Sequence, residues 1–251
     1  MVNVFGEEDQ AKDGKDGKDA LPITKWFPKQ VLGWWRDQSA ASFYFDDTES
    51  GFIYRDDRIV GLKNHATIYD AISEGEVGKL EKLDYAYCLQ FKDSLYSIPQ
   101  MSLADYDPIT SCVTISFLVP TAPKEREYII SANNGRAISI EGDKIQVWGC
   151  ENEPIEIPLQ IDYWNIVFVQ WKNGDDYAGY ILQRIWDNDV IKQFTTTELK
   201  TKPGLYIGKN FNGSICAIDI TNHGSATEIA TNIPIEVRNL LIKDHTDRTF
   251  C

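Results

Sequence analysis

The sequence predicts an all-β protein, a two-sheet antiparallel β-sandwich with one short C-terminal helix. Three observations support this prediction. From Trp26 onward, aromatic and β-branched runs alternate with clusters of Asp, Asn, Gly and Pro, which is the pattern of many short strands joined by turns. Several runs, such as 113–117, alternate apolar and polar residues, so one strand face would be buried. Tight-turn sequences at 141–144 and 172–176 indicate hairpins.

Residues 1–22 are predicted to form a separate N-terminal segment in which glycine recurs with a period of three. Gly14 and Gly17 stand in register with Ala11 and Ala20, and Lys-Asp pairs separate them. A collagen triple helix requires this period, because only glycine fits beside the shared axis. Two interpretations stay open: a short collagen-like segment at which three chains meet, or a charged flexible linker.

The main domain is predicted over residues 23–245, followed by a polar C-terminal tail over residues 246–251. Its one helix is predicted over residues 235–242, where apolar residues have helical spacing and Pro234 suits a first turn. The other elements are short strands, predicted at 42–45, 51–54, 87–91, 113–119, 128–131, 137–140, 144–148, 164–171, 180–186, 190–194, 205–207 and 214–220.

The charge balance argues against two classes of partner. The 251 residues carry a formal net charge of −13. Binding to nucleic acid or to an anionic membrane surface requires clusters of basic side chains, and none is present.

The longest apolar runs, such as 166–169, are far shorter than the ~20 residues that a membrane-spanning helix needs. The first residues also lack the basic and apolar pattern of a signal peptide.

The cysteines indicate neither a zinc site nor a dense disulfide framework. Five are present at wide spacings, without a CxxC pair. Most are predicted to be buried thiols. A single disulfide stays open, and the odd number leaves at least one free thiol or an intermolecular link.

Short segments between residues 31 and 222 follow an order that resembles a known family. An aromatic-Phe-Asp strand comes first, then a Gly and an Asn of a turn, then strands rich in Ile, Phe and Trp, and finally a Phe-x-Gly-x-Ile strand. The segments are Trp35-Arg36, 42–46, Gly61, Asn64, 88–93, 96–99, 113–119, 162–171, 205–208 and 211–220. In this order they resemble the laminin-G-like domains of the concanavalin A-like group. The resemblance implies a jelly-roll sandwich, with Trp164 and Trp171 in its core. It does not identify a ligand, because this fold hosts lectins, adhesion modules and hydrolases.

Catalytic patterns are weak. Laminarinase-type glycoside hydrolases on the same sandwich use Glu-x-Asp-x-x-Glu on one strand, so that two carboxyl groups flank the sugar bond. The nearest string, 141–146, ends in Gln146, which cannot donate or accept the catalytic proton, and its Gly142-Asp143 pair is typical of a turn. In 151–156 the acids surround Pro154, which interrupts a central strand. The chain is therefore predicted not to be an enzyme.

Calcium and glycans are the two kinds of ligand for which the sequence offers residues. Ca²⁺ prefers oxygen ligands from loop carboxylates, and domains of the resembled family often bind it. The candidate metal ligands are Asp105, Asp107, Asp175 and Asp176.

Sugar rings stack on aromatic side chains, while amides and carboxylates bind their hydroxyls. The candidate ligand-binding residues are Trp148, Tyr177, Tyr180 and Trp186. Acid pairs also serve as plain turn formers, and tryptophans as core residues.

One glycosylation sequon is present at Asn212-Gly-Ser214. The preferred interpretation of this sequence is a type I′ hairpin turn, for which Asn-Gly is suited.

Taken together, these features predict a non-catalytic recognition or adhesion module for a glycan or for a cell-surface or matrix protein. The collagen-like segment predicts a homotrimer displayed on a stalk or fibre, located outside the cell or on a virion or fibre surface. Two alternatives stay open: a glycoside hydrolase-like enzyme on the same sandwich, and a ligand-free trimerisation or virion-surface domain. Neither nucleic-acid binding nor direct membrane insertion is expected.

Overall fold

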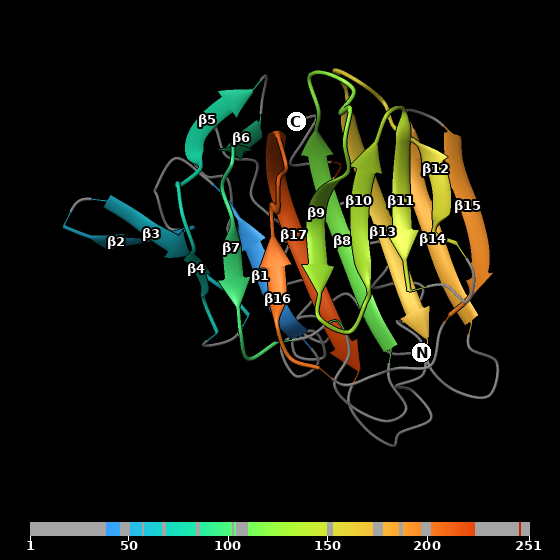
Figure 1. The fold of residues 1–251 in the computed structure, drawn as a ribbon, viewed down its shortest axis with the longest axis horizontal. Helices are drawn as coiled ribbons and strands as arrows, with labels where there is room; N and C mark the ends of the chain where they lie inside the picture. Colours follow the sequence, from blue (N-terminus) through green and yellow to red (C-terminus); the bar gives the residue numbers. More distant parts are fainter. Residues whose placement is uncertain are drawn as a thin grey trace, which may run out of the picture.

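The computed structural model consists of two antiparallel β-sheets that lie face to face (Figure 1). It describes residues 39–45, 51–56, 58–66, 69–83, 86–101, 103, 110–149, 153–172, 178–185, 188–196, 202–223 and 246. All pairings between its named strands are antiparallel. The predicted two-sheet antiparallel β-sandwich is therefore confirmed.

Sheet A has eight strands. Its order is β15-β14-β13-β8-β17-β6-β5, and β1 also pairs with β17. Along β17, residues 213–215 pair with β6 and residues 217–221 pair with β1, so one edge of this strand serves two partners. The strands of sheet A are β1 (Ser39–Tyr44), β5 (Lys79–Leu83), β6 (Ala86–Phe91), β8 (Thr110–Leu118), β13 (Trp164–Lys172), β14 (Ala178–Ile185), β15 (Asn188–Thr195) and β17 (Gly213–His223).

Sheet B has nine strands in the order β12-β11-β10-β9-β16-β7-β4-β3-β2. Its central strands come from distant parts of the chain, because β16 inserts between β9 and β7. The strands of sheet B are β2 (Phe52–Arg55), β3 (Arg58–Leu62), β4 (Ala71–Ser73), β7 (Tyr96–Ile98), β9 (Glu127–Ala132), β10 (Ala137–Glu141), β11 (Lys144–Trp148), β12 (Ile155–Pro158) and β16 (Leu205–Ile207).

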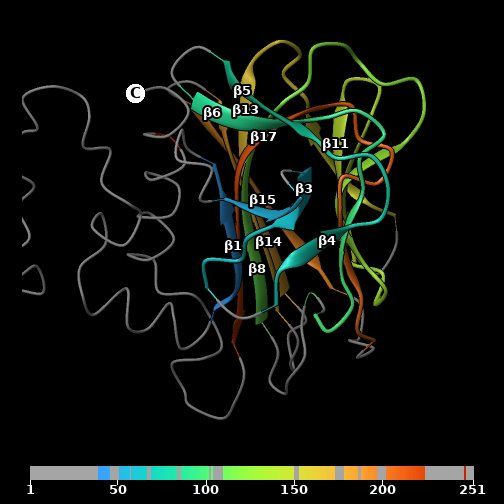
Figure 2. The ribbon, with the colours of Figure 1, turned by 90° about the vertical axis from the view of Figure 1, so that its left-hand side faces the viewer.

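The hydrophobic core fills the space between the two layers. Figure 2 shows them edge-on, with β1 and β8 in one layer and β11 in the other. In β8, Val113, Ile115 and Phe117 are fully buried in this core, as the alternation of residues predicted. Trp171 of β13 lies fully buried in the same core, as predicted. Trp164 is also buried and has a packing role, but it lies in a separate small cluster rather than in this core.

Three cysteines are buried with free thiols, as predicted: Cys88, Cys112 and Cys216. Cys88 and Cys216 pack with Trp164 in a small second cluster. Burial raises the pKa of the Cys88 thiol to about 12, and the nearby Glu81 adds to the effect. This thiol is therefore neutral and unreactive at ordinary pH.

The strand predictions were accurate for central strands and incomplete for peripheral ones. β11 and β16 have the predicted bounds, and the 141–144 hairpin joins β10 to β11. Five short strands are absent from the predicted ranges: β3, β4, β5, β7 and β12. Of these, β7 falls within the segment 96–99 of the family resemblance. β5 and β12 lie at sheet edges. β5 is rich in charged residues, which is typical of an edge strand. β12 alternates Ile and Glu but is only four residues long, begins directly after Pro154 and ends at Pro158, and proline weakens the prediction of a strand.

The predicted hairpin turn at Asn212-Gly213 is wrong. β16 ends at Ile207 in sheet B and β17 begins at Gly213 in sheet A, so the connection crosses between the sheets. The positive φ angles occur instead at Gly208 (83°) and Asn210 (58°). Gly213 serves a different purpose, because a Cβ atom there would lie 2.5 Å from the carbonyl oxygen of Leu118. Glycine allows β17 to approach β8 closely at this point.

Several predicted features fall outside the described residues. These are the collagen-like segment within residues 1–22, the helix at 235–242, and the tail at 246–251 apart from residue 246. In the described part of the chain, no helix is long and apolar enough to cross a membrane.

Because of Tyr96, the free energy of unfolding of this fold should decrease at alkaline pH. Its side chain is fully buried, its hydroxyl oxygen accepts a hydrogen bond from the Gly78 N–H (2.8 Å), and burial raises its pKa to about 12. In the unfolded chain a tyrosine loses its proton near pH 10. Between pH 10 and 12 the unfolded state therefore binds fewer protons than the folded state, and the free energy of unfolding falls by roughly 2–3 kcal/mol.

We expect Tyr96→Phe to remove this decrease. Urea unfolding of both proteins from pH 8 to 11.5 measures it, with Tyr163→Phe as the control because Tyr163 is 52% exposed. Wild type should be the more stable protein at pH 8 and should lose that advantage by pH 11.5. Parallel pH curves for wild type and Tyr96→Phe would contradict the assignment.

Candidate functional site

The outer face of sheet B carries a row of side chains that is fixed by strand register. Trp148 pairs with Ala137, Ala137 pairs with Ser131, and Ser131 pairs with Tyr206. Directly paired residues point to the same side of a sheet. Two large aromatic side chains therefore stand at the ends of this row, with two small residues between them.

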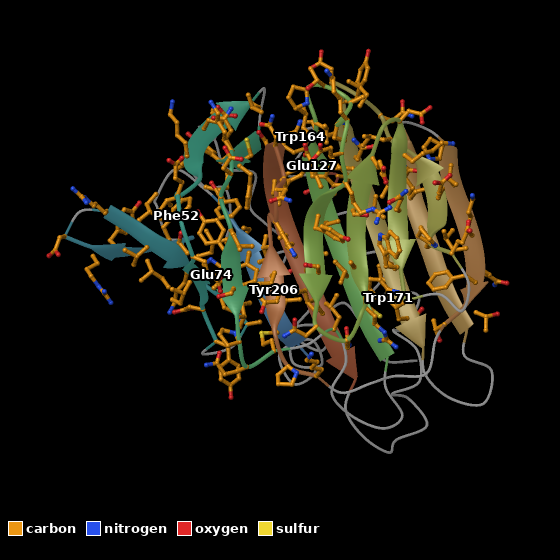
Figure 3. The ribbon with its side chains drawn as sticks, viewed as in Figure 1. Phe52, Glu74, Glu127, Trp164, Trp171 and Tyr206 are labelled. Carbon is orange, nitrogen blue, oxygen red and sulfur yellow. The ribbon has the colours of Figure 1, made fainter. Side chains whose placement is uncertain are left out.

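This row lines a trough of about 520 Å³ on the surface of sheet B. Its lining includes Tyr128, Ser131, Ala137, Trp148 and Tyr206. The other lining residues are Glu74, Leu95, Ala132, Asn133, Gly135 and Lys209. Figure 3 labels Glu74 and Tyr206 on neighbouring parts of this sheet. The lining thus combines aromatic rings with hydroxyl, amide and charged groups.

A β-bulge directs Tyr128 into the trough. In the ladder between β9 and β10, Ile130 pairs with Ile138 and Tyr128 pairs with Ser139, so β9 contains one extra residue, Ile129. Ile129 and Ile130 are both fully buried, whereas Tyr128 is only half-buried. Without the extra residue, the alternation of side chains would turn position 128 to the opposite face.

Hydrogen bonds and a cation–π contact hold Trp148 in place. Its indole Nε1–H donates to the Ser139 hydroxyl oxygen (2.8 Å), and the guanidinium of Arg126 lies 4.5 Å from the ring centroid. Arg126 Nε donates to Gln146 Oε1 (3.1 Å) and Nη2 donates to Glu141 Oε2 (3.0 Å). Arg126 does not line the trough. Trp148 is therefore oriented by groups outside the trough, while its ring forms part of the wall.

The charge of Arg126 is compensated within this cluster. Burial lowers the pKa of the guanidinium, but hydrogen bonds with Tyr128 and Glu141 outweigh that effect, and the pKa lies above its ordinary value. Because the Glu141 carboxylate is 3.0 Å away, the cluster adds no net positive charge beside the trough.

Buried groups support the trough from inside. The Trp171 indole N–H donates to the backbone oxygen of Trp148 (2.7 Å), and the Arg136 guanidinium lies 5.9 Å from the Trp171 ring centroid. Arg136 Nη1 also donates to the Leu103 backbone oxygen (2.9 Å), and burial lowers the pKa of Arg136 to about 9. Arg136 immediately precedes Ala137, so these contacts lie behind the trough floor.

Of the ligand-binding residues predicted from sequence, the structure places Trp148 in the trough. Tyr180 lies in β14 of sheet A, so its strand belongs to the other sheet. Tyr177 and Trp186 lie outside the described residues. The four candidate metal ligands Asp105, Asp107, Asp175 and Asp176 also lie outside them. Within the described part of the chain, no three His, Cys, Asp or Glu side chains gather in a way that could hold a metal ion.

The 141–146 string of the hydrolase alternative does not lie on one strand. Glu141 and Gln146 lie on different strands, β10 and β11, because residues 142–143 form the predicted turn. Glu141 is bound to Arg126, and Gln146 Nε2 lies 3.5 Å from Glu156 Oε1 of the edge strand β12. Gln146 is thus paired with Ser139 on one side and Glu156 on the other, and Glu141 is paired with Lys144.

Of the three aromatic residues that line the trough, Tyr128 and Tyr206 were not predicted as site residues. Tyr206 has a signal in the sequence, because the alternation Leu205-Tyr206-Ile207 puts the tyrosine on the face opposite two apolar residues. Tyr128 has a weaker signal in the Ile129-Ile130 pair, which interrupts alternation at the bulge. Neither pattern reveals that β9 and β16 are neighbours.

The fold is similar to that of botulinum neurotoxin binding domains. The binding domain of botulinum neurotoxin DC in complex with SialylT has a TM-score of 0.52 and 14% sequence identity, covering 84% of this chain and 52% of that one. The serotype C1 binding domain has the same values. A structure described as showing that entry of botulinum neurotoxin type C depends on two ganglioside molecules has a TM-score of 0.50 and 16% identity, covering 85% and 53%.

This chain spans about half the length of those binding domains. At such low identity the similarity shows the fold alone, a two-sheet antiparallel β-sandwich. No protein-family model and no curated protein matches the sequence. The structural neighbours are binding domains rather than catalytic ones.

Removing Arg126 should loosen Trp148 without a large loss of stability. Arg126 and Glu141 are both more than a third exposed, so their ion pair and the cation–π contact together stabilise the fold by about 1 kcal/mol or less. In Arg126→Ala we expect faster hydrogen exchange of the Trp148 indole N–H, measured by NMR. Lys82→Ala is the control, since Lys82 makes a similar contact with Tyr87 (5.2 Å) elsewhere. Unchanged exchange in Arg126→Ala would show that Arg126 does not orient the ring.

Proposed function

We propose that the chain is a non-catalytic recognition module that binds a glycan in the trough of sheet B. The observation that carries this proposal is the row Trp148–Ala137–Ser131–Tyr206. The aromatic rings offer faces on which sugar rings stack, and the small residues between them leave room for the ligand. Hydroxyl and amide groups at Ser131, Tyr206 and Asn133 offer partners for sugar hydroxyls.

The rigidity of the trough supports the same proposal. Trp148 is held by Ser139 and Arg126, and its backbone oxygen by Trp171. A side chain that is already ordered loses less conformational entropy when a ligand binds. The fold similarity to binding domains is consistent with recognition rather than catalysis.

The mode of display is a further part of the proposal. A homotrimer on a collagen-like stalk or fibre, outside the cell or on a virion surface, would present several troughs at once and increase avidity. Calcium bound by Asp105 with Asp107, or by Asp175 with Asp176, stays a prediction, because these residues lie outside the described part of the chain.

A glycan array followed by calorimetric titration of the best ligands tests the proposal. We expect Trp148→Ala and Tyr206→Ala each to weaken binding at least about tenfold, because stacking aromatic residues dominate sites of this kind. Tyr163→Ala is the matched control: it removes an exposed tyrosine in the turn before β13, away from the trough. Circular dichroism should show that all three variants are folded.

Two results would overturn the proposal. One is the absence of binding to every glycan on the array. The other is glycan binding that survives both Trp148→Ala and Tyr206→Ala, because the ligand would then occupy a different surface.

A further inference from the structure

We infer that the trough selects a neutral, linear oligosaccharide whose chain crosses the strands of sheet B from β11 to β16. This inference rests on the proposed function, and it names the class of glycan. Two independent features carry it: the distance between the two aromatic walls, and the balance of charge along the lining.

The positions of the walls determine the length of the ligand. Trp148 lies on β11 and Tyr206 on β16, with β10 and β9 between them, so three strand intervals separate the rings. At ~4.8 Å per interval, the two residues are ~14 Å apart across the sheet. A single sugar ring is much smaller than this distance and would contact one wall only. A ligand that contacts both walls needs about three sugar rings, one for each ~4.8 Å interval.

The lining residues carry balanced charge. Glu74 and Lys209 are the charged residues among the lining groups that the structure describes, and their formal charges cancel. Lys209 Nζ also lies 5.9 Å from the centroid of the Tyr128 ring. Sites for carboxylate, sulfate or phosphate groups use bidentate arginines or clusters of cations. Arg126, which lies over the Trp148 ring, donates to Glu141 and does not line the trough.

The net charge of the whole chain also favours a neutral ligand over an anionic one. A net charge of −13 produces a negative field that lowers the local concentration of anionic ligands. Sugar hydroxyls are not repelled by this field, and they can donate to the Glu74 carboxylate or accept from Lys209. A chain of neutral sugars therefore suits the lining better than one that bears sialic acid or sulfate.

The test uses the full chain and an immobilised panel of neutral linear tetrasaccharides. Each is paired with the same core bearing a sialic acid or a sulfate ester, and with its constituent monosaccharides. We expect binding of at least one neutral tetrasaccharide, with its acidic derivatives at least about tenfold weaker. Affinity for the neutral ligand should change little between 50 and 500 mM salt, because an uncharged ligand forms no ion pair that salt could screen.

Variants test the length of the ligand separately. For the tetrasaccharide, Trp148→Ala and Tyr206→Ala should each reduce affinity at least about tenfold, while Tyr163→Ala should not. Monosaccharides should bind at least about tenfold more weakly than the tetrasaccharide, and a bound monosaccharide should be sensitive to one of the two variants only.

The outcomes separate the two proposals. Preferential, salt-dependent binding of acidic derivatives would overturn the inference of a neutral ligand and leave the glycan-binding function standing. Equal affinity for monosaccharide and tetrasaccharide would overturn the inference of an extended ligand. Failure to bind any member of the panel or of the broader array would overturn both proposals.

Discussion

The hydrogen-bond register of β11, β10, β9 and β16 decides which side chains line the trough. It is fixed from the other side of the sheet, where Ile130, Ile138, Val147 and Ile207 are fully buried against sheet A. Slipping one of these strands by a single residue would expose its apolar side chains and bury polar ones. The burial that stabilises the sandwich thus also places Trp148 and Tyr206 on the outer face. Tyr128 depends in addition on a local departure from the regular ladder, the bulge at Ile129.

The interior and the trough are connected through Trp171. Its ring is part of the core, and its indole N–H binds the backbone of Trp148. On the outer face, Arg126 and Ser139 restrain the Trp148 ring. The contacts made by Arg126 are partly exposed and contribute little to stability. Their effect is on orientation, since a stacking platform binds more tightly when its ring is already ordered. The buried Arg136 adds a second link, from the floor of the trough to Leu103.

The sequence was informative where a signal is local. Alternation and turn residues located the central strands. The turn predicted at Gly142-Asp143 is present, and it places Glu141 and Gln146 on different strands. Trp164 and Trp171 were correctly assigned to packing, and Trp148 was selected as a binding residue that the structure places in the trough. The pairing of β9 with β16 joins residues more than 70 positions apart, and no periodicity within either strand specifies it. For that reason Tyr206 and Tyr128 were missed. Asn212-Gly213 was misassigned because the chain changes sheets there, a choice set by packing rather than by local turn preference.

The central claim is that a ligand contacts the outer face of sheet B between Trp148 and Tyr206. The most direct measurement is an NMR titration of the uniformly ¹⁵N-labelled chain with the best glycan from the array, following the indole and backbone N–H signals. We expect the Trp148 indole signal and the backbone signals of Ser131 and Tyr206 to shift together with one dissociation constant. The indole signal of Trp164, which packs with Cys88 and Cys216 on sheet A, should not move. Shifts confined to sheet A, with Trp148 unchanged, would contradict the account.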